Sequence, residues 1–258
     1  MAGSEVKLLL QARDLRLLRA ISLLRIVDRE QAQEVVGFRS TSRANVRLLK
    51  LTQHGLLNRF FISTINGGKK ALYSLSPKGA LCAQVEQRGI QRQRESVLIG
   101  DFFVEHQLEI NWIYIAIFCR TPPTPNTTVA HWSVFATPIS NAVPLIPDGY
   151  FLVRFREHVR PMFLEVDLGT ETHRIWAKKI GAYLHLARTG EFVRAFGHPQ
   201  FRVLVVATSE RRCNSLRELA GRFTDKIFWF TTSNKVRSYG FWLAIWLRPK
   251  NDQSQSLL

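Results

Sequence analysis

The stretch PLIPDGYFLVRFREHVRPMFLEVDLGTET, residues 144–172, decides the fold of the second part of the chain and gathers several of its acids. Two apolar runs flank a polar centre, which is typical of two antiparallel strands joined by a tight turn. If Asp148 pairs with Glu165, the midpoint of the hairpin falls between Arg156 and Glu157, inside the polar centre. The sequence therefore predicts a hairpin that brings these two carboxylates together.

A third carboxylate, Asp167, lies two residues after Glu165 and should share its face, because side chains alternate along a strand. Two carboxylates about 4 Å apart repel by roughly 4 kcal/mol at an effective dielectric constant near 20. A shared proton, a divalent cation, or arginines from elsewhere in the fold are alternative ways to offset that repulsion. Our leading hypothesis is a Mg²⁺ or Mn²⁺ ion held by Asp148, Glu165 and Asp167.

A lysine follows on the next helical segment, THRIWAKKIGAYLHLA, residues 172–187. Trp176, Ile180 and Tyr183 mark its apolar face by their spacing. At about 100° per residue, Lys179 lies roughly 60° from Trp176 and so near that face. Such a lysine can position a water or stabilise charge on a phosphate, or it can simply extend from the edge of the core.

Further apolar runs and helical stretches surround this segment, and their order predicts an α/β domain with a mixed sheet. Arg211 and Arg212, which follow one of the runs, are candidates for a phosphate contact or for solvated charges. The expected helices are 96–118, 172–187 and 215–223, and the expected strands are 130–137, 149–155, 162–168, 201–208 and 226–232.

The charge of the chain points to a polyanionic partner. The 258 residues carry a formal net charge of +16, and residues 1–93 hold 16 Lys and Arg against 6 Asp and Glu. Three scattered cysteines offer neither a disulfide framework nor a zinc site, which favours a reducing compartment. No uncharged apolar run reaches 18 residues, so we expect no membrane span and a cytoplasmic protein.

The first third carries three short helical patterns. In LRLLRAISLLRI the apolar positions recur at helical spacing. Asp28 is expected to cap DREQAQEVV, with Gln31 as its capping-box partner. Thr41 or Ser42 is expected to cap SRANVRLLKLTQH, which stops at Gly55.

Two β-prone runs, LLNRFFIS and ALYSLS, follow these helices and are joined through Asn66 and Gly67, a strong hairpin signal. Three helices and a hairpin predict an α+β winged helix-turn-helix domain over residues 1–93, whose third helix enters the major groove of double-stranded DNA. Each side chain on its expected DNA face has a plain alternative as a solvated or capping group. The expected DNA-binding residues are Arg39, Ser40, Thr41, Ser42, Arg43, Asn45, Arg47 and Lys50 on the helix and Lys69 and Lys70 on the hairpin.

The segments PDGYF, FLEVDLGTET and WAKKIGAY resemble the replication-relaxation family, proteins of plasmids and other mobile elements, and the resemblance covers about residues 12–230. It implies a winged helix followed by a PD-(D/E)xK, or restriction-endonuclease-like, domain over residues 94–258. By that likeness Asp148 and Glu165 match the metal-binding acids of the nuclease motif. Asp167 stands where the motif has a lysine, and Lys179 is the candidate for that missing group.

Two hypotheses for function follow. The first is a double-stranded DNA-binding protein that cuts or nicks DNA with a divalent metal, using Asp148, Glu165, Asp167 and Lys179. The alternative is a non-catalytic DNA-binding regulator, or a replication or transfer factor, with a degenerate nuclease fold. A homodimer and other mobile-element proteins are further candidate partners. RNA binding has only the charge of the chain in its favour.

Overall fold

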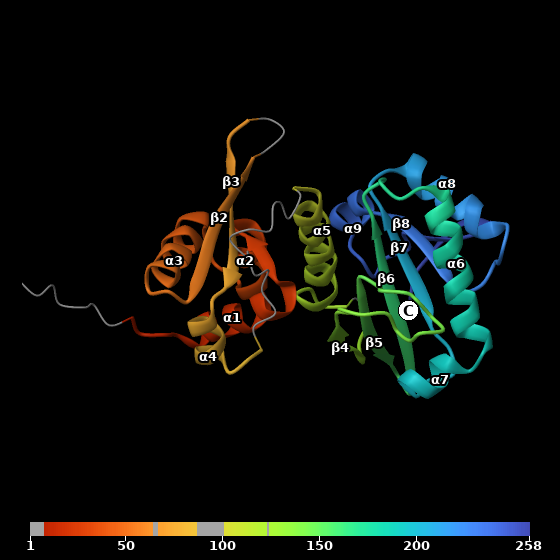
Figure 1. Cartoon of the computed structure of the whole chain (residues 1–258), viewed down its shortest axis with the longest axis horizontal. Coiled ribbons are helices and arrows are strands. Elements are labelled where there is room, and N and C mark those ends of the chain that lie inside the picture. The colour runs from red at the N-terminus through yellow and green to blue at the C-terminus, as the bar shows by residue number, and fades with distance from the viewer. Residues whose placement is uncertain (1–7, 64–66, 87–100, 123) are drawn as a thin grey trace, which may run out of the picture. The chain divides into compact units, whose positions relative to one another are not determined.

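The protein divides into two compact units, Met1–Ile115 and Ala116–Leu258. The computed structural model describes residues 8–63, 67–86, 101–122 and 124–258 (Figure 1). Helix α5 (Asp101–Phe118) begins in the first unit and ends in the second. The domain boundary expected near residue 93, and the expected start of this helix at residue 96, lie outside the described residues. No described helix has the length and apolar character needed to cross a membrane.

The first unit combines helices with a small antiparallel sheet in the order β1-β3-β2. Leucines at helical spacing, such as Leu17 and Leu48, are fully buried with Tyr73 of the sheet in a common core. The elements are α1 (Ala12–Leu24), β1 (Ile26–Asp28), α2 (Arg29–Val36), α3 (Thr41–Gln53), β2 (Leu57–Ser63), β3 (Lys69–Leu75) and α4 (Pro77–Ala83).

The start of α2 confirms one expected contact and corrects another. The carboxylate of Asp28 accepts a hydrogen bond from the backbone N–H of Gln31 at 2.8 Å, so the cap is confirmed. The Gln31 amide does not complete a capping box, because it donates instead to the backbone carbonyl of Leu108 in α5, at 2.7 Å. The Gln31 side chain, which the local pattern assigned to the start of α2, instead hydrogen-bonds a buried carbonyl that is distant in the sequence.

Helix α3 begins one residue earlier than the sequence suggested. Ser40 has an extended backbone and accepts a hydrogen bond from the backbone N–H of Arg43 at 3.3 Å. Ser40 is therefore the N-cap, and Thr41 and Ser42 already belong to the first helical turn.

The β2–β3 hairpin is confirmed. Its strands pair in continuous register from Leu57 opposite Leu75 to Ser63 opposite Lys69. Gly67 has a φ of +77°, in the left-handed region that glycine adopts without strain. Asn66, the other residue of the predicted turn, lies outside the described residues.

The second unit is built on a seven-stranded mixed sheet in the order β10-β9-β8-β7-β6-β5-β4, which confirms the predicted sheet class. Strands β6, β7 and β8 are parallel, and the remaining neighbours are antiparallel. Helices α6, α7 and α8 cover one face and bury an aromatic core against it (Figure 1). The elements are β4 (Thr127–Ser133), β5 (Gly149–Phe155), β6 (His158–Asp167), α6 (His173–Arg188), α7 (Glu191–Phe196), β7 (Arg202–Ala207), α8 (Glu210–Gly221), β8 (Phe228–Thr232), α9 (Ser233–Tyr239), β9 (Trp246–Arg248) and β10 (Asn251–Gln255).

The β5–β6 hairpin has the register that the acid pair predicted. The paired residues run from Gly149 opposite Leu164 to Phe155 opposite His158, which leaves a turn of two residues, Arg156 and Glu157. Arg156 has a φ of +54°, as tight hairpin turns require. Continuing this register by one residue brings Asp148 opposite Glu165.

Candidate functional site

The acidic residues lie where the parallel strands end. Strand β6 ends at Asp167 and β7 at Ala207, and helices α6 and α8 begin shortly after them. In open α/β sheets, ligands bind at the carboxyl ends of the strands. Glu165 and Asp167 share the face of β6 that α6 covers, because both make hydrogen bonds to side chains of that helix.

Glu165 forms the centre of one cluster. Its carboxylate is 1% exposed and accepts hydrogen bonds from the Nζ of Lys179 at 2.9 Å and from the hydroxyl of Tyr183 at 2.6 Å. Lys179 also pairs with a carboxylate oxygen of Glu171 at 2.9 Å. The four-residue spacing of Lys179 and Tyr183 puts both side chains on one face of α6, directed at the same acid.

Asp148 joins this cluster from the adjoining strand. One of its carboxylate oxygens accepts a hydrogen bond from the backbone N–H of Val166 at 2.7 Å, so the side chain is held against β6. Asp148 lies close enough to Glu165 for its charge to influence the ionisation of that carboxyl group. The structure therefore brings together three of the four predicted catalytic residues, Asp148, Glu165 and Lys179.

Burial and charge act against each other in this cluster. Burial raises the pKa of Glu165 to about 7, the charge of Lys179 opposes the rise, and the charge of Asp148 adds to it. Burial alone would lower the pKa of Lys179, but the charges of Glu165 and Glu171 raise it above its ordinary value. The lysine is thus held in its charged form, while Glu165 titrates close to neutral pH.

Asp167 is the centre of a second cluster, which adjoins the first through Glu171 and Trp176. The Arg212 guanidinium donates to both of its oxygens, at 2.7 and 2.9 Å, and the Trp176 indole N–H and the backbone N–H of Gly169 donate one further hydrogen bond each. Burial acts to raise the pKa of Asp167, but hydrogen bonds from Arg212 and Trp176 more than offset this and lower it. An arginine from α8 compensates this acid.

The structure does not bring Asp167 into the cluster of Asp148 and Glu165, so the expected convergence of three carboxylates is not seen. Asp167 shares a strand face with Glu165, but its oxygens are taken by Arg212 and Trp176. Within the part of the chain that the structure describes, no group of three or more His, Cys, Asp or Glu side chains is arranged to hold a metal ion. The partner of Arg212 lies 45 residues away in the chain, so the sequence indicated only a phosphate contact or a solvated charge for this arginine.

The second candidate site is the face of the first unit that α3 and the hairpin form. Two of its predicted DNA-binding residues form ion pairs with acids of the same unit. The guanidinium of Arg47 donates to the fully buried carboxylate of Asp14, with an Nε–Oδ1 distance of 2.8 Å, and Lys70 pairs with Asp28 at 3.1 Å. All the other predicted residues are exposed, and one of them, Ser40, serves as the cap of α3. The remaining seven are Arg39, Thr41, Ser42, Arg43, Asn45, Lys50 and Lys69.

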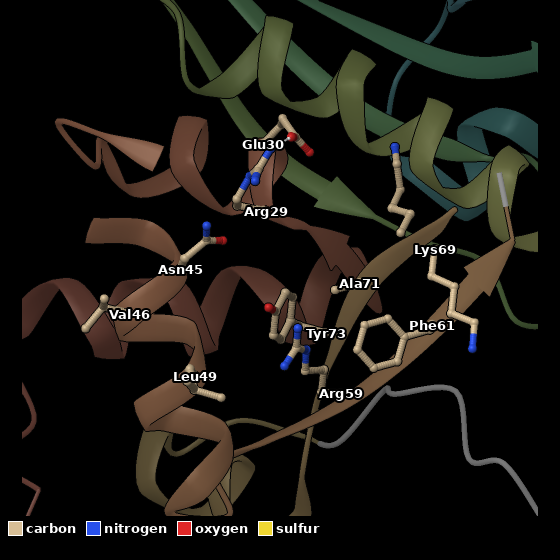
Figure 2. Close-up of a pocket in the computed structure, with 11 residues that line it drawn as sticks. Arg29, Glu30, Asn45, Val46, Leu49, Arg59, Phe61, Lys69, Ala71 and Tyr73 are labelled. Atoms are coloured by element: carbon tan, nitrogen blue, oxygen red, sulfur yellow. Dashed lines mark hydrogen bonds and ion pairs between the residues drawn. The ribbon is translucent and has the colours of Figure 1, made fainter. Parts of the chain in front are cut away.

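A groove of about 640 Å³ separates α3 from the hairpin (Figure 2). Asn45, Val46 and Leu49 line it from α3, and Arg59 and Phe61 line it from β2. The remaining lining residues are Arg29, Glu30, Lys69, Lys70, Ala71 and Tyr73.

Several of these groove residues escaped the sequence analysis. Val46, Leu49 and Phe61 are 55%, 42% and 51% exposed, although apolar residues in a periodic segment normally predict a core face. The buried face of α3 is formed by Ala44, Leu48 and Leu51. The signal that was available is that α3 has more apolar residues than one buried face can hold.

Comparison with known proteins agrees with the resemblance noted in the sequence. A family model described as replication-relaxation matches residues 18–199, which include parts of both units. No curated protein and no solved structure matches the chain. The match indicates a role in the replication or relaxation of plasmids or other mobile elements. Since the model covers well over half of the sequence, the chain belongs to the replication-relaxation family.

Proposed function

We propose that the protein binds double-stranded DNA through α3 and the β2–β3 hairpin, with the first unit acting as a winged helix. The elements and their order support this proposal, since three helices precede a hairpin whose strands flank a groove beside α3. In winged helices the corresponding helix enters the major groove and the hairpin contacts the backbone.

The observation that carries the proposal is a set of uncompensated cations on this face. Five arginines and lysines of this face make no ion pair with any described residue, whereas the neighbouring Arg47 and Lys70 are paired. Cations that no carboxylate neutralises are available for phosphates, which supply most of the affinity for DNA. The set comprises Arg39, Arg43, Lys50, Arg59 and Lys69.

The exposed residues in the middle of α3 would contact the edges of the bases. The amide of Asn45 can make paired hydrogen bonds to adenine, and the exposed side chains of Val46 and Leu49 can pack on thymine methyl groups. These three residues lie in the groove together with Arg59 and Lys69 of the cation set (Figure 2), so one surface would make both phosphate contacts and base contacts.

The test is a titration of labelled duplex DNA with the full chain at several salt concentrations. Loss of one phosphate contact lowers the slope of log affinity against log salt by about one unit, and we expect this for Arg59→Ala. Arg188→Ala, at an exposed position at the end of α6, is the matched control and should behave as wild type. Equal slopes for wild type and Arg59→Ala would remove the hairpin from the binding surface.

A second candidate function is metal-dependent nicking by a PD-(D/E)xK-like second unit. The observation in its favour is the meeting of Asp148, Glu165 and Lys179 at the carboxyl ends of the strands. Asp148 and Glu165 would hold Mg²⁺ or Mn²⁺, which when bound would polarise a phosphodiester oxygen. Asp167 does not fit as a ligand, because the Arg212 fork and Trp176 hold its oxygens. Glu165 would bind the ion only in place of its present donors, Lys179 and Tyr183.

Lys179 has a defined role in this second candidate. Its ammonium group is held charged by Glu165 and Glu171 and lies beside the acids that would bind the ion. A fixed positive charge in that place would stabilise the negative charge that develops on the phosphate during hydrolysis.

Supercoiled plasmid incubated with the protein and Mn²⁺ tests this candidate. We expect nicked circles with wild type, and a loss of at least a hundredfold in rate with Asp148→Asn and with Glu165→Gln, because each removes a ligand charge without changing side-chain shape. Nicking that persists in both variants would reject these residues. A protein that binds duplex DNA tightly but never nicks it would leave the DNA-binding proposal standing and remove the nuclease.

A further inference from the structure

A row of arginines crosses the seven-stranded sheet at the edge opposite the acid site. Arg160 lies near the start of β6, Arg202 is the first residue of β7, and Arg248 is the last residue of β9. Between the last two lies Trp229 of β8, since Phe230 pairs with Leu247 and thereby sets Trp229 beside Arg248. Adjacent strands are about 4.8 Å apart, so the row is compact.

The guanidinium groups of this row are held by neutral partners. Those of Arg202 and Arg248 each lie 4.7 Å from the centroid of the Trp229 ring. Arg160 and Arg202 each donate a hydrogen bond of 2.8 Å to the backbone carbonyl of Leu257. These contacts fix where the cations lie, but they bring no negative charge.

No acid among the residues that the structure describes compensates the row. In the described ranges of the chain, no side-chain carboxylate forms an ion pair with Arg160, Arg202 or Arg248. The Nε of Arg248 is buried without a hydrogen-bond partner. Burial lowers the pKa of Arg202 to about 10, and the charges of Arg160 and Arg248 add to that lowering. Positive charge is thus concentrated here at a cost to the folded protein, which contrasts with the paired Arg212 and Arg47.

We propose that Arg160, Arg202 and Arg248 form a binding site for a phosphate group of a nucleic-acid strand. Arginine forks match phosphate oxygens in geometry, and a phosphate offers enough oxygens to accept hydrogen bonds from several guanidinium groups together. An arriving phosphate would relieve the repulsion within the row, and the partly exposed guanidinium groups of Arg160, Arg202 and Arg248 are within reach of solvent. This site rests on the second unit alone and does not depend on the surface of α3.

The first arm of the test uses inorganic phosphate as the probe on the full chain. The midpoint of thermal unfolding is measured in phosphate and in chloride at equal ionic strength, because a ligand that binds the folded state raises that midpoint. We expect phosphate to raise the midpoint of wild type, and the increment to be lost in Arg160→Gln and Arg248→Gln. Arg188→Gln, an exposed arginine of the same unit, is the control and should keep the increment.

A purely structural role gives a different result. If the row only anchors the residues around Leu257, the two variants would unfold earlier in chloride yet keep the whole phosphate increment, and the proposal would fail. Should the glutamine variants not fold, Arg202→Lys serves instead. Lysine keeps the positive charge but lacks the paired N–H donors of a guanidinium, so phosphate should raise the unfolding midpoint by less than in wild type. An unchanged rise counts against the site.

The second arm identifies the source of the phosphate. The salt slope for DNA binding should fall by about one unit in Arg248→Gln, and by about two in the double variant with Arg59→Ala. An unchanged slope in Arg248→Gln, together with a lost phosphate increment, would assign the site to a small phosphate compound and reject the nucleic-acid strand. Failure of Arg59→Ala alone to change the slope bears on the α3 surface and leaves this site untouched.

Discussion

Two acids that lie two residues apart on one strand face have opposite electrostatic environments. Glu165 is buried beside a second carboxylate and shares its lysine with Glu171, so its pKa is raised. Asp167 receives both donors of an arginine fork and an indole N–H, so its pKa is lowered. Burial disfavours the charge of both, and the difference lies in the second carboxylate, Asp148, beside Glu165 and in the larger number of donors to Asp167.

This difference predicts a pH dependence that belongs to Glu165. Its folded pKa of about 7 lies above the ordinary value of 4.5, so its contribution to stability is fully present below about pH 4.5 and is lost as the pH rises toward 7. Between pH 4.5 and 7 the unfolding free energy of Glu165→Gln should therefore decrease less than that of wild type. Urea unfolding at a series of pH values measures this.

The matched control for that measurement is Glu171→Gln, which removes the more exposed carboxylate from the same lysine. Its pH profile should stay close to that of wild type. If Glu165→Gln and wild type lose the same stability between pH 4.5 and 7, the buried acid is not the group that titrates.

The residues themselves reveal part of this site. The pairing of Asp148 with Glu165 followed from the turn at their midpoint, and the place of Lys179 followed from its angle to Trp176 on the helix. Both inferences use local geometry alone. The pairing of Asp167 with Arg212 could not be found, because it depends on how α8 packs beside α6 after a separation of 45 residues.

At the scale of elements, strands with strong alternation and clear turns were predictable, and short segments were not. Strand β5 has the predicted bounds, whereas β4 begins three residues before the expected 130. Helix α8 begins at residue 210 rather than 215, because Ser209 caps it by accepting from a backbone N–H. Helices α7 and α9 and strands β9 and β10 have seven residues or fewer and owe their form to tertiary packing, which no local pattern reports.

The β4–β5 pair makes a prediction through Gly149. A Cβ at this position would come within 2.5 Å of the ring of Trp132, so the ring must move to admit it. We expect Gly149→Ala to destabilise the protein by about 1–3 kcal/mol, as overpacking does. Thermal unfolding measures this, and the midpoint of Gly149→Ala should be lower than that of wild type.

Gly181→Ala provides the opposite expectation on α6. No atom lies within 4 Å of its added Cβ, and alanine favours a helix over glycine by about 0.5–1 kcal/mol, so this variant should be more stable than wild type.

A Gly149→Ala protein as stable as wild type would show that Trp132 is not packed against β5 as described.

At the scale of the whole molecule, the net charge of +16 predicts a polyanionic partner, which stays a prediction. Among the described residues, each unit has cations that make no ion pair, such as Arg59 and Arg202. The family match runs through parts of both units, as the resemblance in the sequence implied. The surplus of apolar residues in α3 is a sequence signal for an exposed apolar patch, but the groove itself was not predictable, because it also needs the β2–β3 hairpin beside Val46 and Leu49. Exposure is a property of the folded chain and cannot be read from residue type.

The most direct test of the DNA-binding account compares two arginines of α3, Arg43 and Arg47, in salt-dependent duplex titrations and urea unfolding. Arg43 is exposed, whereas Arg47 is paired with the buried Asp14. Arg43→Ala should lower the salt slope by about one unit with stability unchanged, and Arg47→Ala should cost about 3 kcal/mol of stability with the slope unchanged. A wild-type slope for Arg43→Ala would contradict the account.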